Sequence, residues 1–234
     1  MKILNQFKRL RTWIFLGLIM DVLYRFNFAQ TNDHSALNFI ELLLFALFII
    51  GIRLNKNNTF YKRFSFLQGS RKAYIFLSWL FGMLFELTLS TSPGNIGGMH
   101  PNTAISFLVA QGFYIPFAIL GLYLIRKYHY TFKELYFASI AAAMAEGIVF
   151  NHVIPALLFT PLFFLIPIVI AYYGLVYSLF LCLPLIFINP QSLYSENFKE
   201  ISLKRKIIYG FAIAVISLLI YAIWYVIVTN IIKV

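Results

Sequence analysis

The chain has 234 residues, of which 61% are hydrophobic and only 12% are charged. Soluble domains carry a charge on roughly a quarter of their residues, so this composition excludes a soluble protein, which would lack the polar surface to cover its core. The net charge of +11 does not indicate a nucleic-acid partner, because the basic residues stand between apolar runs, where they would face anionic lipid headgroups.

The first apolar run begins at Trp13, after an N-terminal stretch rich in lysine and arginine. This arrangement is similar to a secretory signal, but Asp21 and Arg25 interrupt the apolar region and no cleavage site of the small-x-small type follows. We therefore expect an uncleaved first membrane span over residues 12–28.

Six further apolar runs follow, and each is long enough to cross about 30 Å of hydrocarbon as a helix. The expected spans are 36–54, 73–91, 104–125, 134–154, 167–188 and 207–232. The sequence thus predicts an all-α fold: a polytopic membrane helix bundle of about seven transmembrane helices that forms a single integral membrane domain.

The segment 155–166, between the fifth and sixth spans, is predicted to interrupt regular helix. Pro155, Pro161 and Pro167 recur every six residues, and each removes a helical N–H donor. Two forms fit this pattern: a short broken or re-entrant piece, or a kinked and tilted helix.

Charge in the loops predicts the orientation. Nearly all lysines and arginines fall in four stretches that seven crossings would place on one side, namely 2–11, 53–72, 126–133 and 199–206. Because cytoplasmic loops carry the excess of lysine and arginine, we expect a cytoplasmic N-terminus, an external C-terminus and a location in the plasma membrane.

Ionisable residues inside membrane spans are costly and therefore become candidates for function. They are Asp21 and Arg25 in the first span, Glu41 in the second, Glu86 in the third and Glu146 in the fifth. Other polar residues are expected at similar depth or at the outer helix ends, namely Gln111, His100, Asn151 and His152. All of these residues fall in the middle or outer half of the predicted bilayer, and the cytoplasmic half has nothing comparable.

Small residues share helix faces with two of these acids. Ser78, Gly82 and Glu86 follow one another at intervals of four, as do Ala138, Ala142 and Glu146. Small residues at this spacing allow close helix approach in membranes. We therefore expect both glutamates to point into the bundle.

Asp21 and Arg25 stand one helical turn apart and can form an ion pair. The pair either makes the first span tolerable in lipid, or leaves Arg25 to anchor an anionic headgroup or to orient Glu41 or Glu86. The four intramembrane acids outnumber the one arginine, so at least one is expected to stay protonated.

Specific chemistries receive little support from sequence patterns. His100, His152 and one glutamate could act as metal ligands, but no His-Glu-x-x-His or His-x-x-x-His spacing occurs, and neither does Gly-x-Ser-x-Gly. Cys182 is the only cysteine, lies in an apolar run, and is expected to be a buried structural thiol. We therefore expect neither a metal nor a cofactor.

The leading expectation is an enzyme that performs acid–base chemistry on a lipid or isoprenoid from the outer leaflet. Glu86 and Glu146 would be the acid–base pair. The other polar residues would bind substrate or tune the pair: Asp21, Arg25, Glu41, Gln111, His100, Asn151 and His152. The high content of phenylalanine and tyrosine adds aromatic faces that could stabilise a cationic isoprenoid intermediate.

Two other classes of protein remain open. A proton-coupled transporter would use the same acids as protonation sites and the proline-rich segment as its gate. A non-catalytic subunit of a membrane complex would use them only to satisfy one another or a partner helix. In each case membrane lipids are the expected partners. If the protein is an enzyme, its expected substrate is a hydrophobic small molecule.

Overall fold

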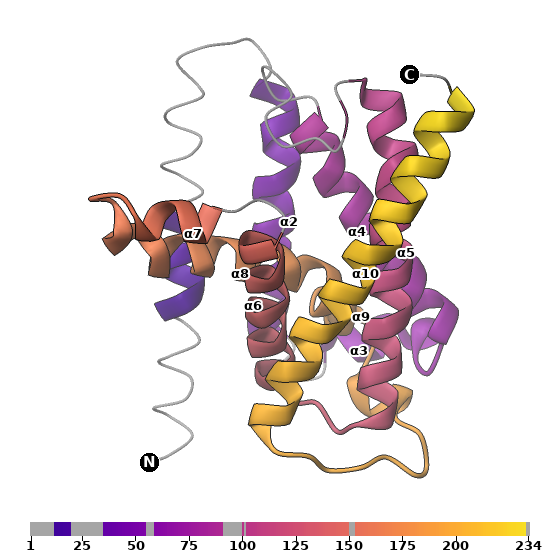
Figure 1. Cartoon of the computed structure of the whole chain (residues 1–234). Helices are drawn as coiled ribbons and strands as arrows, with labels where there is room; N and C mark the ends of the chain where they lie inside the picture. Colours follow the sequence, from indigo (N-terminus) through magenta and orange to yellow (C-terminus); the bar gives the residue numbers. More distant parts are fainter. Residues whose placement is uncertain are drawn as a thin grey trace.

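A computed structural model describes residues 12–19, 35–54, 59–90, 100, 102–149 and 153–232 (Figure 1). These residues are predominantly helical and include no β-strand, so the predicted all-α class is confirmed for this part of the chain. Helices α2, α5, α6 and α10 run roughly along one direction in Figure 1, and the short helix α7 lies across them.

Six helices of sixteen or more residues form the body of the described structure, and shorter helical pieces connect them. The long helices are α2 (Ser35–Leu54), α4 (Arg71–Ser90), α5 (Thr103–Lys127), α6 (Phe132–Val149), α8 (Ile166–Leu181) and α10 (Leu203–Ile232). The short pieces are α3 (Thr59–Arg63), η2 (Ser65–Leu67), α7 (Val153–Leu158), η4 (Phe163–Leu165), α9 (Pro184–Phe187) and η5 (Pro190–Leu193). Residues 12–19 are also helical.

Three of the described helical segments are long and apolar enough to cross a membrane: Thr103–Lys127, Phe163–Leu181 and Leu203–Ile232. They indicate a membrane protein. The count of seven crossings and the direction of the chain remain predictions.

The described residues between α6 and α8, 153–165, form short helical pieces joined by a turn. α6 ends at Val149, α7 covers Val153–Leu158, and a turn leads to η4. Pro167 stands in the first turn of α8, where its missing N–H has no partner to lose. The depth of this segment in a bilayer remains a prediction.

α8 ends at Leu181, before the end of the predicted sixth span, because Pro184 has no N–H to donate to the carbonyl of Phe180. Two side chains of α4 satisfy the carbonyls left at this helix end. The Ser78 hydroxyl donates to the Phe180 carbonyl at 2.7 Å, and the Tyr74 hydroxyl donates to the Leu181 carbonyl at 3.1 Å. The contact between α4 and α8 thus stabilises the break in the helix.

The helices meet through small residues. α10 packs against α5 and α6, α6 packs against α8, and α4 packs against α5. A Cβ atom added at Gly210 of α10 would overlap the backbone of Ala138 in α6, so these two helices approach more closely than any larger residue would allow. This contact agrees with the packing expected for the Ala138 face.

Three connecting regions meet at one end of the molecule, the lower end in Figure 1: residues 59–70, 126–131 and 184–202. The Tyr61 hydroxyl donates to the Leu185 carbonyl at 3.0 Å, and the Ser195 hydroxyl donates to the Arg126 carbonyl at 2.9 Å. The described residues of three of the four predicted basic stretches therefore lie at a common end, which we call the loop end. The fourth stretch, 2–11, lies outside the described residues.

Candidate functional site

Glu86 of α4 has no solvent-exposed surface, as the small residues on its face predicted. Two side chains of α5 donate hydrogen bonds to its carboxyl group. The Ser106 hydroxyl lies 2.6 Å from Oε1, and the Tyr114 hydroxyl lies 3.4 Å from Oε2. Gly82, one turn before Glu86, makes this possible, because a Cβ atom there would lie 2.5 Å from the Tyr114 ring.

Glu146 of α6 is half-buried, and it too is held by a phenol. The Tyr177 hydroxyl of α8 donates to its Oε2 atom at 2.6 Å. This short distance is typical of a strong hydrogen bond between a hydroxyl and a carboxylate. Each of the two predicted acids is therefore paired with a tyrosine from a neighbouring helix.

Aromatic rings join the two glutamate–tyrosine pairs. The Phe180 ring lies 5.1 Å from the Tyr114 ring and 5.7 Å from the Tyr177 ring, measured between centroids. Phe113 contacts the same two tyrosines, at 5.4 Å and 6.0 Å. We call these six residues the Glu–Tyr cluster: Glu86, Glu146, Tyr114, Tyr177, Phe113 and Phe180.

Electrostatic contacts also link the two acids. Tyr114 and Tyr221 of α10 both lie within electrostatic range of the carboxyl groups of Glu86 and Glu146. The acids therefore share one environment, to which α4, α5, α6, α8 and α10 all contribute.

His100 lies next to this environment. Its backbone N–H donates to the Ser106 hydroxyl at 3.2 Å, and Ser106 in turn donates to Glu86. The His100 Nδ1 atom accepts from the backbone N–H of Asn102 at 3.0 Å. The Asn102 side chain caps α5 by accepting from the N–H groups of Ala104 and Ile105, so the start of α5 fixes Ser106 beside Glu86.

Gln111 is positioned differently. Its Oε1 atom accepts from the Trp79 indole at 2.6 Å, and its Nε2 atom donates to the Phe107 carbonyl at 2.9 Å and to the Met83 sulfur at 3.1 Å. The described structure brings Gln111 to neither glutamate, and its hydrogen bonds tie α5 to α4.

Five other predicted site residues cannot be placed in the cluster. Asp21, Arg25, Asn151 and His152 lie outside the described residues, and Glu41 lies in α2 with a side chain outside the description. Their roles remain predictions.

No protein-family model, curated protein or solved structure matches this chain. Two carboxyl groups beside phenols can exchange protons, and the surrounding ring faces favour positive charge. Among the described residues, no three His, Cys, Asp or Glu side chains gather where they could hold a metal ion.

Sequence reasoning missed the three residues that donate hydrogen bonds to the two acids. Ser106 and Tyr114 stand eight positions apart in α5, which places them on one helix face, and this spacing could have identified them. Tyr177 has no comparable pattern. It is one of 15 tyrosines, and only the contact between α6 and α8 brings it to Glu146.

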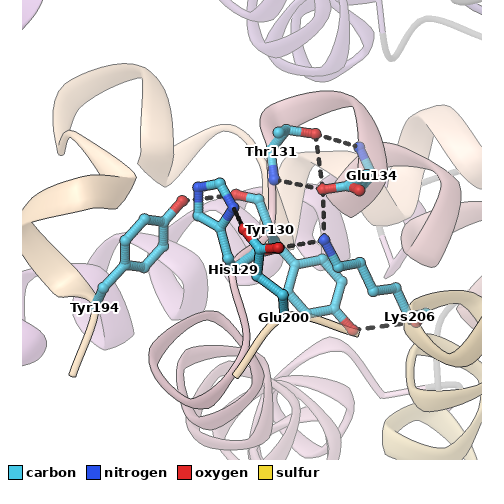
Figure 2. Close-up of polar contacts among 7 residues, drawn as sticks. All are labelled: His129, Tyr130, Thr131, Glu134, Tyr194, Glu200 and Lys206. Carbon is cyan, nitrogen blue, oxygen red and sulfur yellow. Dashed lines mark hydrogen bonds and ion pairs between the residues drawn. The ribbon is translucent and has the colours of Figure 1, made fainter. Parts of the chain in front are cut away.

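A second buried polar cluster lies at the loop end (Figure 2). Lys206 of α10 is only 4% exposed, and its ammonium group lies 2.7 Å from Glu134 of α6 and also donates to the His129 carbonyl. The backbone N–H and hydroxyl of Thr131 donate to the same carboxyl group at 2.8 Å and 2.9 Å. Thr131 and Glu134 thus form a capping box at the start of α6.

The burial of Lys206 in this second cluster was not predicted from the sequence. The sequence placed Lys206 among headgroup-facing loop residues, but the structure buries it in an ion pair. Tyrosines complete the contact: Tyr130 donates to the Lys206 carbonyl and Tyr194 donates to the Tyr130 carbonyl. Burial, reinforced by the nearby Glu134 charge, raises the pKa of Tyr194 to about 12 and also raises that of Tyr130, so both phenols remain donors at neutral pH.

Proposed function

We propose that the chain is a plasma-membrane enzyme of seven spans, with a cytoplasmic N-terminus, that performs acid–base chemistry on a lipid or isoprenoid at the Glu–Tyr cluster. One observation carries this proposal. Two carboxyl groups from different helices, each paired with a phenol, face one aromatic cluster in a chain with helices fit to span a membrane.

The arrangement of the loops supports the proposed topology. The three described basic stretches lie at one end, as loops on the cytoplasmic side of a membrane would. Glu146 stands twelve residues beyond Glu134, which is about 18 Å along the helix axis. The Glu–Tyr cluster would therefore lie well inside the bilayer, away from the cytoplasmic surface.

The environments of the two acids suggest different roles. Glu86 is fully buried, whereas Glu146 is half-buried and so is the acid that a substrate could reach. Glu146 would exchange a proton with the substrate, and Glu86 would set the charge of the site through Tyr114. The faces of Phe113 and Phe180 would stabilise positive charge on a substrate carbon.

The test replaces each acid by its neutral isostere. Purified Glu86→Gln and Glu146→Gln variants are incubated with lipid extract from the source cells, and the products are compared by mass spectrometry. Because positioned general acids and bases contribute about 10²–10⁴-fold, we expect Glu146→Gln to lose at least a hundredfold in conversion and Glu86→Gln to be strongly impaired. Glu196→Gln, an exposed change at the loop end, is the matched control. Full conversion by both cluster variants would eliminate the assignment.

A proton-coupled transporter is the second candidate, and the buried Lys206–Glu134 pair favours it. This pair places ionisable groups at the other end of α6 from Glu146, as a proton path through the bundle would require. Uptake into proteoliposomes that depends on a pH gradient, without any change in lipid products, would support this reading. Unchanged lipids and no uptake would favour a non-catalytic subunit.

A further inference from the structure

The segment that joins α2 to α4 is fixed to the loop end on its inner side. The Gln68 amide nitrogen donates to the Phe187 carbonyl at 2.9 Å, and the Gln68 oxygen accepts from the Asn189 N–H at 2.8 Å. The Phe64 ring packs edge-on against the Phe187 ring at 5.2 Å. With the Tyr61 hydrogen bond, these contacts hold residues Thr59–Leu67, the α3–η2 segment, against α9.

The outer side of the α3–η2 segment combines positive charge with an exposed aromatic ring. Lys62 and Arg63 are exposed, and Phe66, three residues later, is 77% exposed. Arg71 and Lys72, at the start of α4, are exposed as well. Within the described part of the chain, none of these four cations forms an ion pair.

The sequence around the segment offers no compensating charge. No aspartate or glutamate occurs between Glu41 and Glu86, although six lysines and arginines do. The segment also lies directly between two apolar helices, because α2 ends at Leu54 and α4 begins at Arg71. A surface at this position meets the headgroup layer if α2 and α4 cross the membrane.

We propose that the α3–η2 segment is a binding site for anionic lipid headgroups. The charges of Lys62 and Arg63 complement a headgroup phosphate, and Phe66 inserts among the acyl chains just below it. An exposed phenylalanine next to basic residues is typical of an interfacial contact with lipid. The site depends on the membrane location but not on the chemistry of the Glu–Tyr cluster.

The test measures lipid binding to the full chain in detergent by native mass spectrometry, with phosphatidylglycerol and phosphatidylcholine as probes. We expect the unmodified protein to prefer phosphatidylglycerol by about tenfold or more, and this preference to fall with added salt. Lys62→Gln combined with Arg63→Gln should abolish most of the preference. Phe66→Ala should weaken binding of both lipids. Thermal unfolding of each variant checks that these exposed changes leave the fold intact.

The matched control is Lys204→Gln combined with Arg205→Gln, which removes the same charge from exposed positions at the start of α10. This control should keep most of the preference for phosphatidylglycerol. An equal loss in the two double variants would overturn the proposal, because it would show a general charge effect of the loop end. An unchanged preference in the Lys62 and Arg63 variant would overturn it as well.

Discussion

Each carboxyl group of the Glu–Tyr cluster accepts a hydrogen bond from a phenol that belongs to a neighbouring helix. A buried or half-buried carboxyl group that loses such a donor bears the full cost of its desolvation, which exceeds the net gain from an ordinary hydrogen bond. At the scale of single residues, the tyrosines therefore help to make the acids tolerable inside the bundle.

Replacing Tyr177 by phenylalanine tests this role. The change keeps the ring against Phe180 but removes the 2.6 Å bond to Glu146. We expect a loss of about 1–3 kcal/mol in stability, seen as a lower midpoint of thermal unfolding in detergent, together with a shift in the pH dependence of any activity. Tyr123→Phe, which alters an exposed hydroxyl on α5, is the control and should leave both measurements unchanged. Equal behaviour of the two variants would contradict the role of Tyr177.

The acids could be predicted from the sequence, whereas Tyr177, the partner of Glu146, could not. A glutamate inside an apolar run is rare, so Glu86 and Glu146 are conspicuous without any structure. Tyrosine is common in this chain, and the importance of Tyr177 depends on which helix faces α6. Gln111 shows the converse, because a polar residue at the predicted depth of the site turns out to bond the Trp79 indole.

At the scale of elements, the end of α8 shows how one proline affects two helices. Pro184 leaves the Phe180 carbonyl without its helical donor, and Ser78 of α4 supplies one in its place. Hydropathy alone extends the sixth span to residue 188, because the sequence remains apolar beyond Pro184. The break is stabilised by a tertiary contact, so the hydropathy of the sequence alone does not predict it.

Two substitutions separate these contributions. Ser78→Ala should lower stability by about 1–3 kcal/mol, because it leaves the Phe180 carbonyl buried without a donor. In a Pro184→Ala background the same change should cost less, because the new backbone N–H at position 184 can donate to that carbonyl. Thermal unfolding of the four proteins in this double-mutant cycle gives the coupling. Ser65→Ala, at an exposed position, serves as control, and additive effects would refute the explanation.

At the scale of the whole molecule, basic loops gather at one end and the capped start of α5 lies at the other. Composition and charge pattern were sufficient to predict an all-α membrane protein and this grouping of the loops. They were not sufficient for the number of crossings. That number depends on whether less apolar helices such as α4 and α6 also span the bilayer. Glu86 is buried in α4, and Glu134 of α6 pairs with Lys206.

The direction of the chain is open to a direct measurement. Cys182 is the only native thiol and is fully buried, so a cysteine introduced at an exposed position dominates labelling. In intact cells, a membrane-impermeant maleimide should label Ala104→Cys but should label Ser65→Cys only after the membrane is opened, because the loop end is cytoplasmic in the proposed topology. The reverse pattern would invert the topology.

The setting of the tryptophans has a practical consequence. The chain has three tryptophans. The Trp79 indole donates to Gln111, and the Trp224 indole donates to the carbonyl of Leu108, one turn earlier in α5. If Trp13 is replaced by phenylalanine, intrinsic tryptophan fluorescence would therefore report on the packing of α5 against α4 and α10. Because α5 also carries Ser106 and Tyr114, emission recorded during titration with a candidate lipid would give an optical readout of lipid binding beside α5 without any added dye.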